Sequence, residues 1–168
     1  MSIKQRDKSY RGNASQFFVA GELCRRGYAA VVTLGNTPNT DILCSNRAGT
    51  KFVHIQVKTF VPGGRTCSVG VKAEKYFGPK FFWVLAGIPH PDSPLPYEYF
   101  IIPSKIMARN ISRNHRLWLD TPGKHGQAHS ADTKFRTVHL PPHRNRNGWT
   151  IERYRERWDL IAKQLADP

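Results

Sequence analysis

The stretch 40-TDILCSNRAGTKFVHIQVKT-59 decides the fold, because it contains two candidate strands and the turn that joins them. Apolar and polar residues alternate over 51–59, which is the period of a β-strand with one buried face. Asn46 precedes a turn centred near Arg47–Gly49, and asparagine and glycine are both favoured in hairpin turns. We therefore predict an antiparallel hairpin of strands 41–45 and 51–59.

Polar residues of this hairpin form a candidate site. Gln56 and Lys58 lie two positions apart on one strand, so they point to the same face, although both are costly to bury without partners. The position of the turn places Asp41 opposite His54 or Ile55, next to Gln56. We therefore expect the side chains of Asp41, Gln56 and Lys58 to converge.

The chemistry of these groups suits a divalent cation. The Asp41 carboxylate, the Gln56 amide oxygen and the Val57 carbonyl are hard oxygen ligands of the kind that Mg²⁺ prefers, with water completing its coordination. Mn²⁺ accepts the same ligands. The neighbouring Lys58 can hold a phosphate, lower the pKa of an attacking water or stabilise developing negative charge. The alternative is a partly buried ion pair between Asp41 and Lys58, which leaves Gln56 unexplained.

The composition of the chain points to a polyanionic partner. Its 168 residues suit one domain, and an apolar share of 39% indicates a folded, soluble chain. Lys and Arg outnumber Asp and Glu by 26 to 12, and this net charge of +14 favours nucleic acid over an acidic membrane surface. We see neither a membrane span nor a signal peptide. Cys24, Cys44 and Cys67 are expected to be reduced core thiols of a cytoplasmic protein.

A helix is predicted from about Asn13 to Arg26, and Gly27 is expected to close it. On a helical wheel Gln16 falls within the apolar arc, whereas Glu22 falls with Ser15 on the polar side. Gln16 can therefore reach the hairpin residues if this helix packs on their face. The alternative is a core amide that bonds to nearby backbone.

The remainder of the chain predicts a small α/β domain with a mixed sheet. The apolar run FFWVLAG at 81–87 predicts a buried central strand, with Trp83 in the core. A helix is expected over 103–111, whereas residues 112–148 lack periodicity and predict an irregular basic loop. Thr150 can cap a final helix, whose apolar stripe is expected to pack on the domain. Further strands are predicted at 29–34, 67–71, 97–102 and 135–140.

These residues resemble the PD-(D/E)XK nuclease superfamily, whose motif is an Asp at the start of one strand and a Glu or Gln, one spacer and a Lys on the next. Here the motif is Asp41 followed by Gln56-Val57-Lys58. Segments 12–44 and 53–59 are most similar to the branch of archaeal Holliday-junction resolvases and related small bacterial proteins. The resemblance implies a restriction-endonuclease-like α/β core, with a mixed central sheet flanked by helices. It implies one nuclease-like domain over 1–168, with a core at 12–111, the irregular loop at 112–148 and a C-terminal helix at 149–166.

The resemblance also implies a metal-dependent deoxyribonuclease. Asp41 would be the main ligand of Mg²⁺, and Gln56 and the Val57 carbonyl would add oxygens. Lys58 would orient or activate the attacking water. In that branch an acidic ligand stands eleven residues before the glycine that ends the first helix, and the residue at that position here is Gln16. Asp41 would then be the only carboxylate of the site, so weak metal affinity and slow turnover are expected.

Two other functions stay open. One is a catalytically inactive DNA-binding module with the same fold, and the other is a scaffold of a DNA-processing complex that docks through the C-terminal helix. The pathway stays open among repair, junction resolution, homing and restriction. A homodimer is compatible with the cleavage of two strands.

Basic residues outside the motif are candidates for contacts with the DNA backbone, although an ordinary solvated surface is the alternative for each. His125 and His129 are spaced i, i+4 but lack the further ligands of a zinc site, so we expect them to be solvated or to face DNA. The predicted DNA contacts are Lys72, Lys75, Arg113, Arg116, Arg144 and Arg146.

Overall fold

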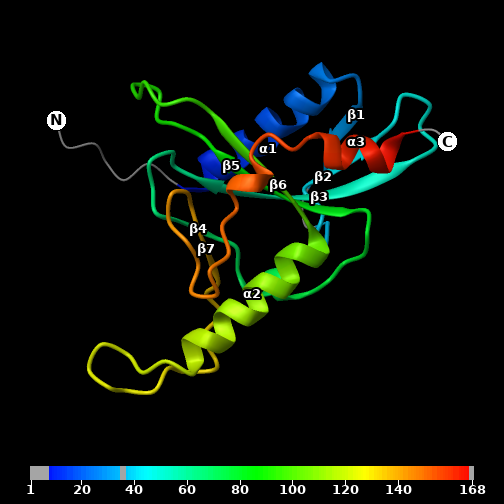
Figure 1. Cartoon of the computed structure of the whole chain (residues 1–168). Coiled ribbons are helices and arrows are strands. Elements are labelled where there is room, and N and C mark those ends of the chain that lie inside the picture. The colour runs from blue at the N-terminus through cyan, green and yellow to red at the C-terminus, as the bar shows by residue number, and fades with distance from the viewer. Residues whose placement is uncertain (1–7, 35–36, 167–168) are drawn as a thin grey trace.

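A five-stranded mixed sheet forms the centre of the fold, and helices cover both of its faces (Figure 1). The computed structural model describes residues 8–34 and 37–166. In this sheet β3 and β5 are parallel and the other neighbours are antiparallel, which confirms the predicted mixed α/β class. In order across the sheet the strands are β1 (Ala29–Val32), β2 (Ile42–Ser45), β3 (Phe52–Phe60), β5 (Phe81–Gly87) and β6 (Glu98–Pro103).

The β2–β3 hairpin forms where the sequence predicts it, but its turn is longer than expected. The register pairs Ile42 with Ile55. Asn46 holds the longer turn, because its backbone N–H donates to the Lys51 carbonyl (3.1 Å) and its Oδ1 accepts from the Lys51 N–H (3.1 Å). This register places Asp41 opposite Gln56, one residue beyond the predicted His54 or Ile55, and the Asp41 N–H donates to the Ile55 carbonyl (2.9 Å).

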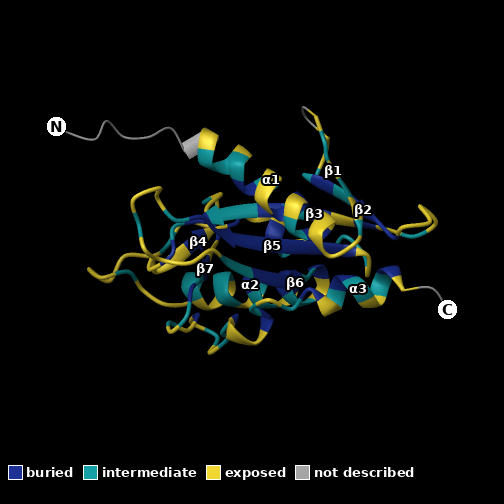
Figure 2. Cartoon of the chain, turned by 90° about the horizontal axis from the view of Figure 1, so that it is seen from above, coloured by how far each residue is buried: buried dark blue, intermediate teal, exposed yellow. Residues whose placement is uncertain are grey.

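Each face of the sheet carries its own apolar cluster. α1 (Lys8–Arg25) and α3 (Asp159–Leu165) lie on one face, here called the α1 face, and α2 (Ser104–Leu119) covers the other, the α2 face (Figure 1). β5 is buried along its whole length, as its apolar run predicts (Figure 2). The α1-face cluster includes Val19, Leu23, Ile55, Val57, Val84 and Ile161, and the α2-face cluster includes Phe60, Trp83, Leu85, Met107 and Ile111.

The C-terminus of α1 is closed by Gly27, as predicted. Gly27 has a φ of +90°, and its N–H donates to the Cys24 carbonyl (2.9 Å). The Tyr28 N–H donates to the Leu23 carbonyl (3.2 Å), which completes a Schellman motif. Cys24, on the last turn of α1, is exposed and not a core thiol as expected, whereas Cys44 and Cys67 are buried, as predicted.

The buried side of α1 differs from the helical-wheel prediction. Ser15, predicted on the polar side, is fully buried, and its Oγ lies 2.6 Å from the Thr59 Oγ1 of β3. Two hydroxyls can pair inside the core, so burial of Ser15 costs little. The apolar arc is therefore rotated toward Ser15, which leaves Gln16 half-buried and Phe17 exposed. Glu22 is ion-paired with Arg25 and Arg26, as its place on the wheel suggested.

The segment 112–148 contains more regular structure than predicted. α2 continues to Leu119, because its Trp118 packs on His129, which lies far along the sequence and is invisible to local periodicity. The predicted strand within this segment is present as β7 (Thr137–His139), which pairs with β4 (Thr66–Ser68) in a small second sheet. A 3₁₀ helix, η1 (Val71–Glu74), follows β4 and contacts α2.

The predicted C-terminal helix over 149–166 is wrong in its extent. It is divided into a 3₁₀ turn, η2 (Glu152–Tyr154), and the short α3. Between them the chain crosses the outer edge of β6, where Arg155 bridges to Phe100 and the Glu156 N–H donates to the Tyr99 carbonyl (2.9 Å). The apolar stripe packs on the domain as predicted, but Ile151 and Tyr154 join the α2-face cluster, and Trp158, Ile161 and Leu165 join the α1-face cluster.

No helix in the described part of the chain combines the length and the apolar character that a membrane crossing requires.

Candidate active site

A cavity of about 490 Å³ opens on the α2 face of the sheet, beside β3. The predicted residues Asp41, Gln56 and Lys58 all line it. They meet there because β3 alternates: Ile55 and Val57 point into the α1-face cluster, so Gln56 and Lys58 point to the other side. The structure thus brings together the three side chains that the hairpin sequence singled out.

The Asp41 carboxylate is held by β3. Its Oδ2 accepts the Val57 backbone N–H (2.7 Å) and also bonds the Gln56 Nε2. Asp41 directly precedes β2, so its side chain occupies the edge of β3 at a point that β2 does not reach. The N–H and C=O of one strand residue point toward the same edge, so the Val57 carbonyl lies on the Asp41 side of β3.

Burial raises the pKa of Asp41 above the ordinary value of a carboxyl group. The Val57 N–H, the charge of Lys58, the Gln56 amide and the charge of Lys72 oppose this rise, in that order of size. The carboxylate is therefore short of positive charge even with two lysines nearby. A cation at the carboxylate would restore the ionised form.

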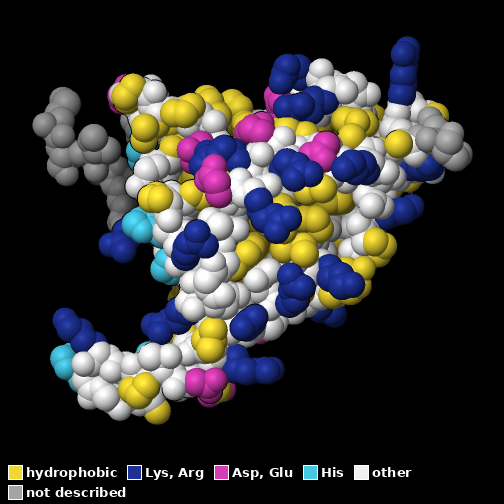
Figure 3. Space-filling view, viewed as in Figure 1, with side chains coloured by type: hydrophobic (Ala, Val, Ile, Leu, Met, Phe, Trp, Pro, Cys, Tyr) yellow, Lys and Arg dark blue, Asp and Glu magenta, His cyan; other side chains and the backbone are white. Residues whose placement is uncertain are grey.

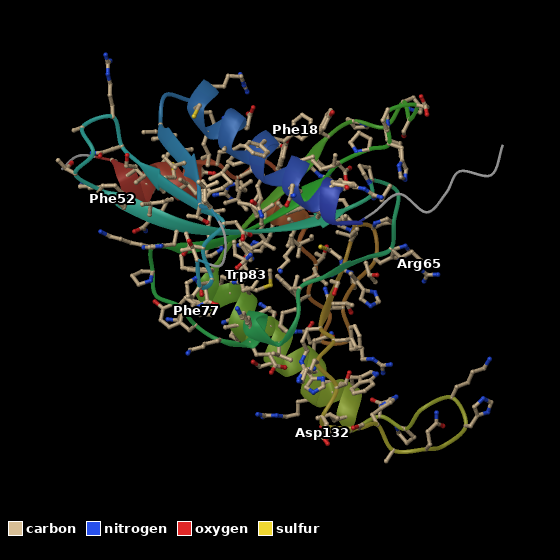
Figure 4. All side chains as sticks on the ribbon, turned by 180° about the vertical axis from the view of Figure 1, so that it is seen from behind. Phe18, Phe52, Arg65, Phe77, Trp83 and Asp132 are labelled. Carbon is tan, nitrogen blue, oxygen red and sulfur yellow. The ribbon has the colours of Figure 1, made fainter. Side chains whose placement is uncertain are left out.

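Lys72 and Trp83 also line the cavity. Lys72 belongs to η1, and the sequence predicted it as a DNA contact and not as a neighbour of Asp41. Trp83 lies beside Gln56 in the parallel β3–β5 pair and is only 1% exposed, as its predicted core position requires. It lies between the sheet and α2 (Figure 4), and its Nε1 is buried without a hydrogen-bond partner. The apolar run predicted that Trp83 is a core residue but gave no indication that it also lines a cavity.

Gln16 is not among the described residues that line the cavity. It lies half-buried on α1, which packs on the α1 face, next to Ser15 and its contact with Thr59. No group of three or more His, Cys, Asp or Glu side chains in the described residues is placed to hold a metal. Among these residues Asp41 is the only carboxylate that lines the cavity.

The donor set fits one Mg²⁺ or Mn²⁺ that keeps several waters. It consists of the Asp41 carboxylate, the Gln56 carboxamide in contact with it, and the Val57 carbonyl at the same edge of β3. Mg²⁺ is commonly bound by one or two carboxylates together with substrate phosphates. The set does not fit a structural zinc site, which is closed, tetrahedral and built from cysteine and histidine.

The six residues predicted to contact DNA lie in separate surface regions. Among them, Lys72 is the one that lines the Asp41 cavity. Lys75 stands over the ring of Phe77 (5.7 Å to the centroid). Figure 3 shows Lys and Arg side chains spread over the visible face, including the length of α2. The other predicted contacts lie on α2 (Arg113 and Arg116), in the 144–148 turn (Arg144) and at a second cavity (Arg146).

His129 has a structural role that the sequence did not predict. Its ring stacks on Trp118 at 3.8 Å between centroids, and its Nδ1 bonds the Trp118 carbonyl (2.7 Å). The prediction of a solvated or DNA-facing side chain is therefore wrong for His129. His125 is exposed, in agreement with the prediction.

The order of the elements defines the fold. A first helix, the β1–β3 meander and the parallel β5 form a restriction-endonuclease-like core, so the predicted fold is confirmed. Asp41 stands before β2 and Gln56-Val57-Lys58 stands on β3, as the hairpin sequence predicted. The bacterial homing endonuclease I-Ssp6803I is similar at a TM-score of 0.54 and 15% identity, over 94% of this chain and 93% of that chain. Hjc, a Holliday junction resolvase from the archaeal hyperthermophile Archaeoglobus fulgidus, matches at a TM-score of 0.44 and 17% identity, over 77% of this chain and 84% of that chain. No protein-family model and no curated protein sequence matches the chain.

Proposed function

We propose that this protein hydrolyses phosphodiester bonds of DNA with the help of a divalent cation at Asp41. The observation that carries the proposal is the cavity in which Asp41, Gln56 and Lys58 meet, on the fold of a nuclease. The net charge of +14 supports a polyanionic substrate.

The residues of the cavity have different roles in the proposed reaction. Asp41, the Gln56 amide oxygen and the Val57 carbonyl would hold Mg²⁺ or Mn²⁺. The ion would lower the pKa of a bound water and offset negative charge on the phosphate. Lys58 donates to the phosphate or to the attacking water, and its fixed charge stabilises the pentavalent transition state. Lys72 of η1 supplies a second positive charge at the cavity.

Nucleases that cut both strands often dimerise, and a homodimer would supply two such sites. One carboxylate in place of the usual two lowers the negative charge offered to the metal. We therefore expect weak metal affinity and a slow enzyme.

A second candidate function is a DNA-binding module that does not cleave. The observation in its favour is the single carboxylate of the cavity, together with Gln16 at the helix position where the resemblance expects an acid. A protein with this function would use the same fold and basic surface to bind DNA but would not hydrolyse it.

One assay separates the two functions. Supercoiled plasmid and branched DNA are incubated with the protein and either Mg²⁺ or Mn²⁺. Wild type is expected to nick DNA, Lys58→Ala to lose the activity, and Lys163→Ala to keep it. Lys163 is a matched control, because it is an exposed lysine on α3, on the α1 face. If wild type and Lys58→Ala bind DNA and are equally inert with both metals, the DNA-binding module is the correct function.

A further inference from the structure

A second cavity, of about 340 Å³, lies between α2 and the segment 133–146. This volume falls in the usual range for small-ligand pockets, about 300–1,000 Å³. Its walls include the aromatic Trp118 and Phe135 and the basic Arg136 and Arg146. Neither the core nor the proposed cleavage site accounts for this combination.

The two cavities share a wall. The Arg136 carbonyl accepts the N–H groups of Val69 (2.8 Å) and Gly70 (3.3 Å), which line the Asp41 cavity. The Arg136 side chain lines the second cavity and donates to Glu74 of η1 (2.6 Å). Lys72, two residues earlier on η1, lines the first. The two cavities are therefore neighbours, connected through Arg136 and η1.

Phe135 is exposed in a way that packing does not explain. It is 80% exposed, yet its backbone is fixed, because the buried Arg136 guanidinium donates to the carbonyls of Thr133 (2.7 Å) and Phe135 (2.9 Å). An exposed aromatic ring on a held backbone beside a cavity is a stacking platform for a planar ligand. Lys134 precedes Phe135 in the sequence, and Arg146 lines the cavity. Both are exposed and can contact a phosphate backbone.

The interior of the cavity offers polar groups suited to the edge of a base. The Asn114 Oδ1 is enclosed and has no hydrogen-bond partner, so it gains from a donor that enters the cavity. Burial lowers the pKa of His115 and of His139, so both rings are neutral at pH 7 and each offers one donor and one acceptor.

We propose that this cavity is a second DNA subsite that receives one unstacked nucleobase of the strand held at the Asp41 cavity. The base stacks on Phe135, its edge pairs with Asn114, and Arg146 contacts the adjoining phosphate. This inference rests on the proposed DNA function, but it concerns binding and not cleavage.

The test is equilibrium binding in the presence of a chelator, so that cleavage plays no part. Three duplexes are compared: one fully paired, one with a single bulged nucleotide, and one with an abasic site at the bulge. We expect the base to tighten binding by about tenfold over the abasic bulge, as base–aromatic stacking contributes. Phe135→Ala is expected to abolish this difference without changing affinity for the paired duplex. The control is Phe17→Ala, which removes an exposed phenylalanine (67% exposed) of α1 and is expected to change neither value.

A second measurement locates the base. A bulged 5-iodouracil is expected to crosslink under ultraviolet light to Phe135 or Trp118, as mapped by mass spectrometry. Equal affinity of wild type for the bulge with and without the base, or crosslinks confined to other surfaces, would overturn the subsite. Failure to bind any duplex would overturn the DNA function as well, whereas absence of cleavage in the plasmid assay leaves the subsite intact.

Discussion

The Val57 N–H donates to the Asp41 Oδ2 at 2.7 Å, so a carboxylate completes the edge of β3 where β2 has not yet begun. Because the N–H and C=O of one strand residue point to the same edge, the Val57 carbonyl lies on the same side of β3 as the Asp41 side chain. The Gln56 amide reaches the same carboxylate from the α2 face. The site therefore lies where β2 begins beside β3.

Replacement of Asp41 by asparagine is expected to stabilise the metal-free protein at neutral pH. Burial raises the pKa of Asp41, so the folded state favours the protonated form. The stability that Asp41 contributes is fully present below the ordinary carboxyl pKa. It is lost as pH rises through the pKa that Asp41 has in the folded protein. Asparagine retains an acceptor for Val57 but carries no charge. In the presence of a chelator, we expect Asp41→Asn to melt a few degrees above wild type at pH 7 and at the same temperature as wild type near pH 3. Added Mn²⁺ should raise the Tm of wild type alone; a lower Tm for the variant in chelator would contradict this account.

Metal binding is expected to weaken with acid at a higher pH than for an ordinary aspartate. The ligand must be ionised, and its raised pKa means that protons compete sooner as pH falls. Calorimetric titration with Mn²⁺ at several values between about pH 4 and pH 7 would measure this. The affinity should begin to fall clearly above the ordinary aspartate pKa of about 3.9. A constant affinity down to that value would show that Asp41 is not the ligand.

Alanine substitutions of Lys72 and Lys75 are expected to affect DNA binding similarly but the rate of cleavage differently. Both are exposed lysines of the same segment, but Lys72 lines the Asp41 cavity and Lys75 stands over Phe77. Each alanine variant should reduce the slope of log affinity against log salt by about one unit or less. Lys72→Ala should in addition lower the rate of cleavage at saturating DNA by about tenfold or more, as loss of a phosphate contact in the transition state requires. Equal rates for the two variants would place Lys72 outside the reaction.

Two glycines of one helix are expected to respond to alanine with opposite signs. Gly27 has a φ of +90°, so a Cβ there costs about 1–2 kcal/mol. Gly21 lies within α1, and a Cβ built on it meets nothing within 4 Å, so alanine gains up to about 1 kcal/mol of helix propensity. Thermal unfolding should shift by roughly 2–4 °C per kcal/mol, downward for Gly27→Ala and upward for Gly21→Ala. Two shifts of the same sign would contradict the Schellman motif as the end of α1.

The local pattern predicted the elements that a single periodicity defines. β5 begins and ends at the residues of its apolar run, and the β2–β3 hairpin follows from alternation and turn residues. The predicted convergence of Asp41 with Gln56 needed only the hairpin, which is a local structure. These features succeed because each depends on residues close in the sequence.

The features that failed depend on contacts between distant segments. The buried Ser15 pairs with Thr59, and no helical wheel contains that hydroxyl. The apolar stripe from Ile151 to Leu165 has helical spacing, yet it does not form one continuous helix. Its two halves pack on opposite faces of the sheet, which interrupts the helix. The second cavity likewise joins α2 to the segment 133–146, which local periodicity treats as an unstructured loop.

Gln16→Glu tests whether the first helix belongs to the site. Ser15 fixes α1 on Thr59, two residues beyond Val57, along the part of β3 that has no β2 neighbour. Gln16 follows Ser15 on α1, so the substitution tests whether its side chain comes near the open edge beside Asp41. We expect an added carboxylate there to tighten Mn²⁺ binding by about fivefold, since a charge in a partly solvated site contributes on the order of 1 kcal/mol. Cleavage should become faster with it.

The control for this substitution is Asn13→Glu, which adds the same charge to an exposed position one turn earlier on α1. It should leave the metal affinity within about twofold, because exposed charges are screened over about 10 Å. An unchanged affinity in Gln16→Glu, with both variants folded, would show that α1 keeps residue 16 away from the metal. The site would then consist of Asp41 and β3 alone, and the scarcity of carboxylates would favour the DNA-binding module over the nuclease.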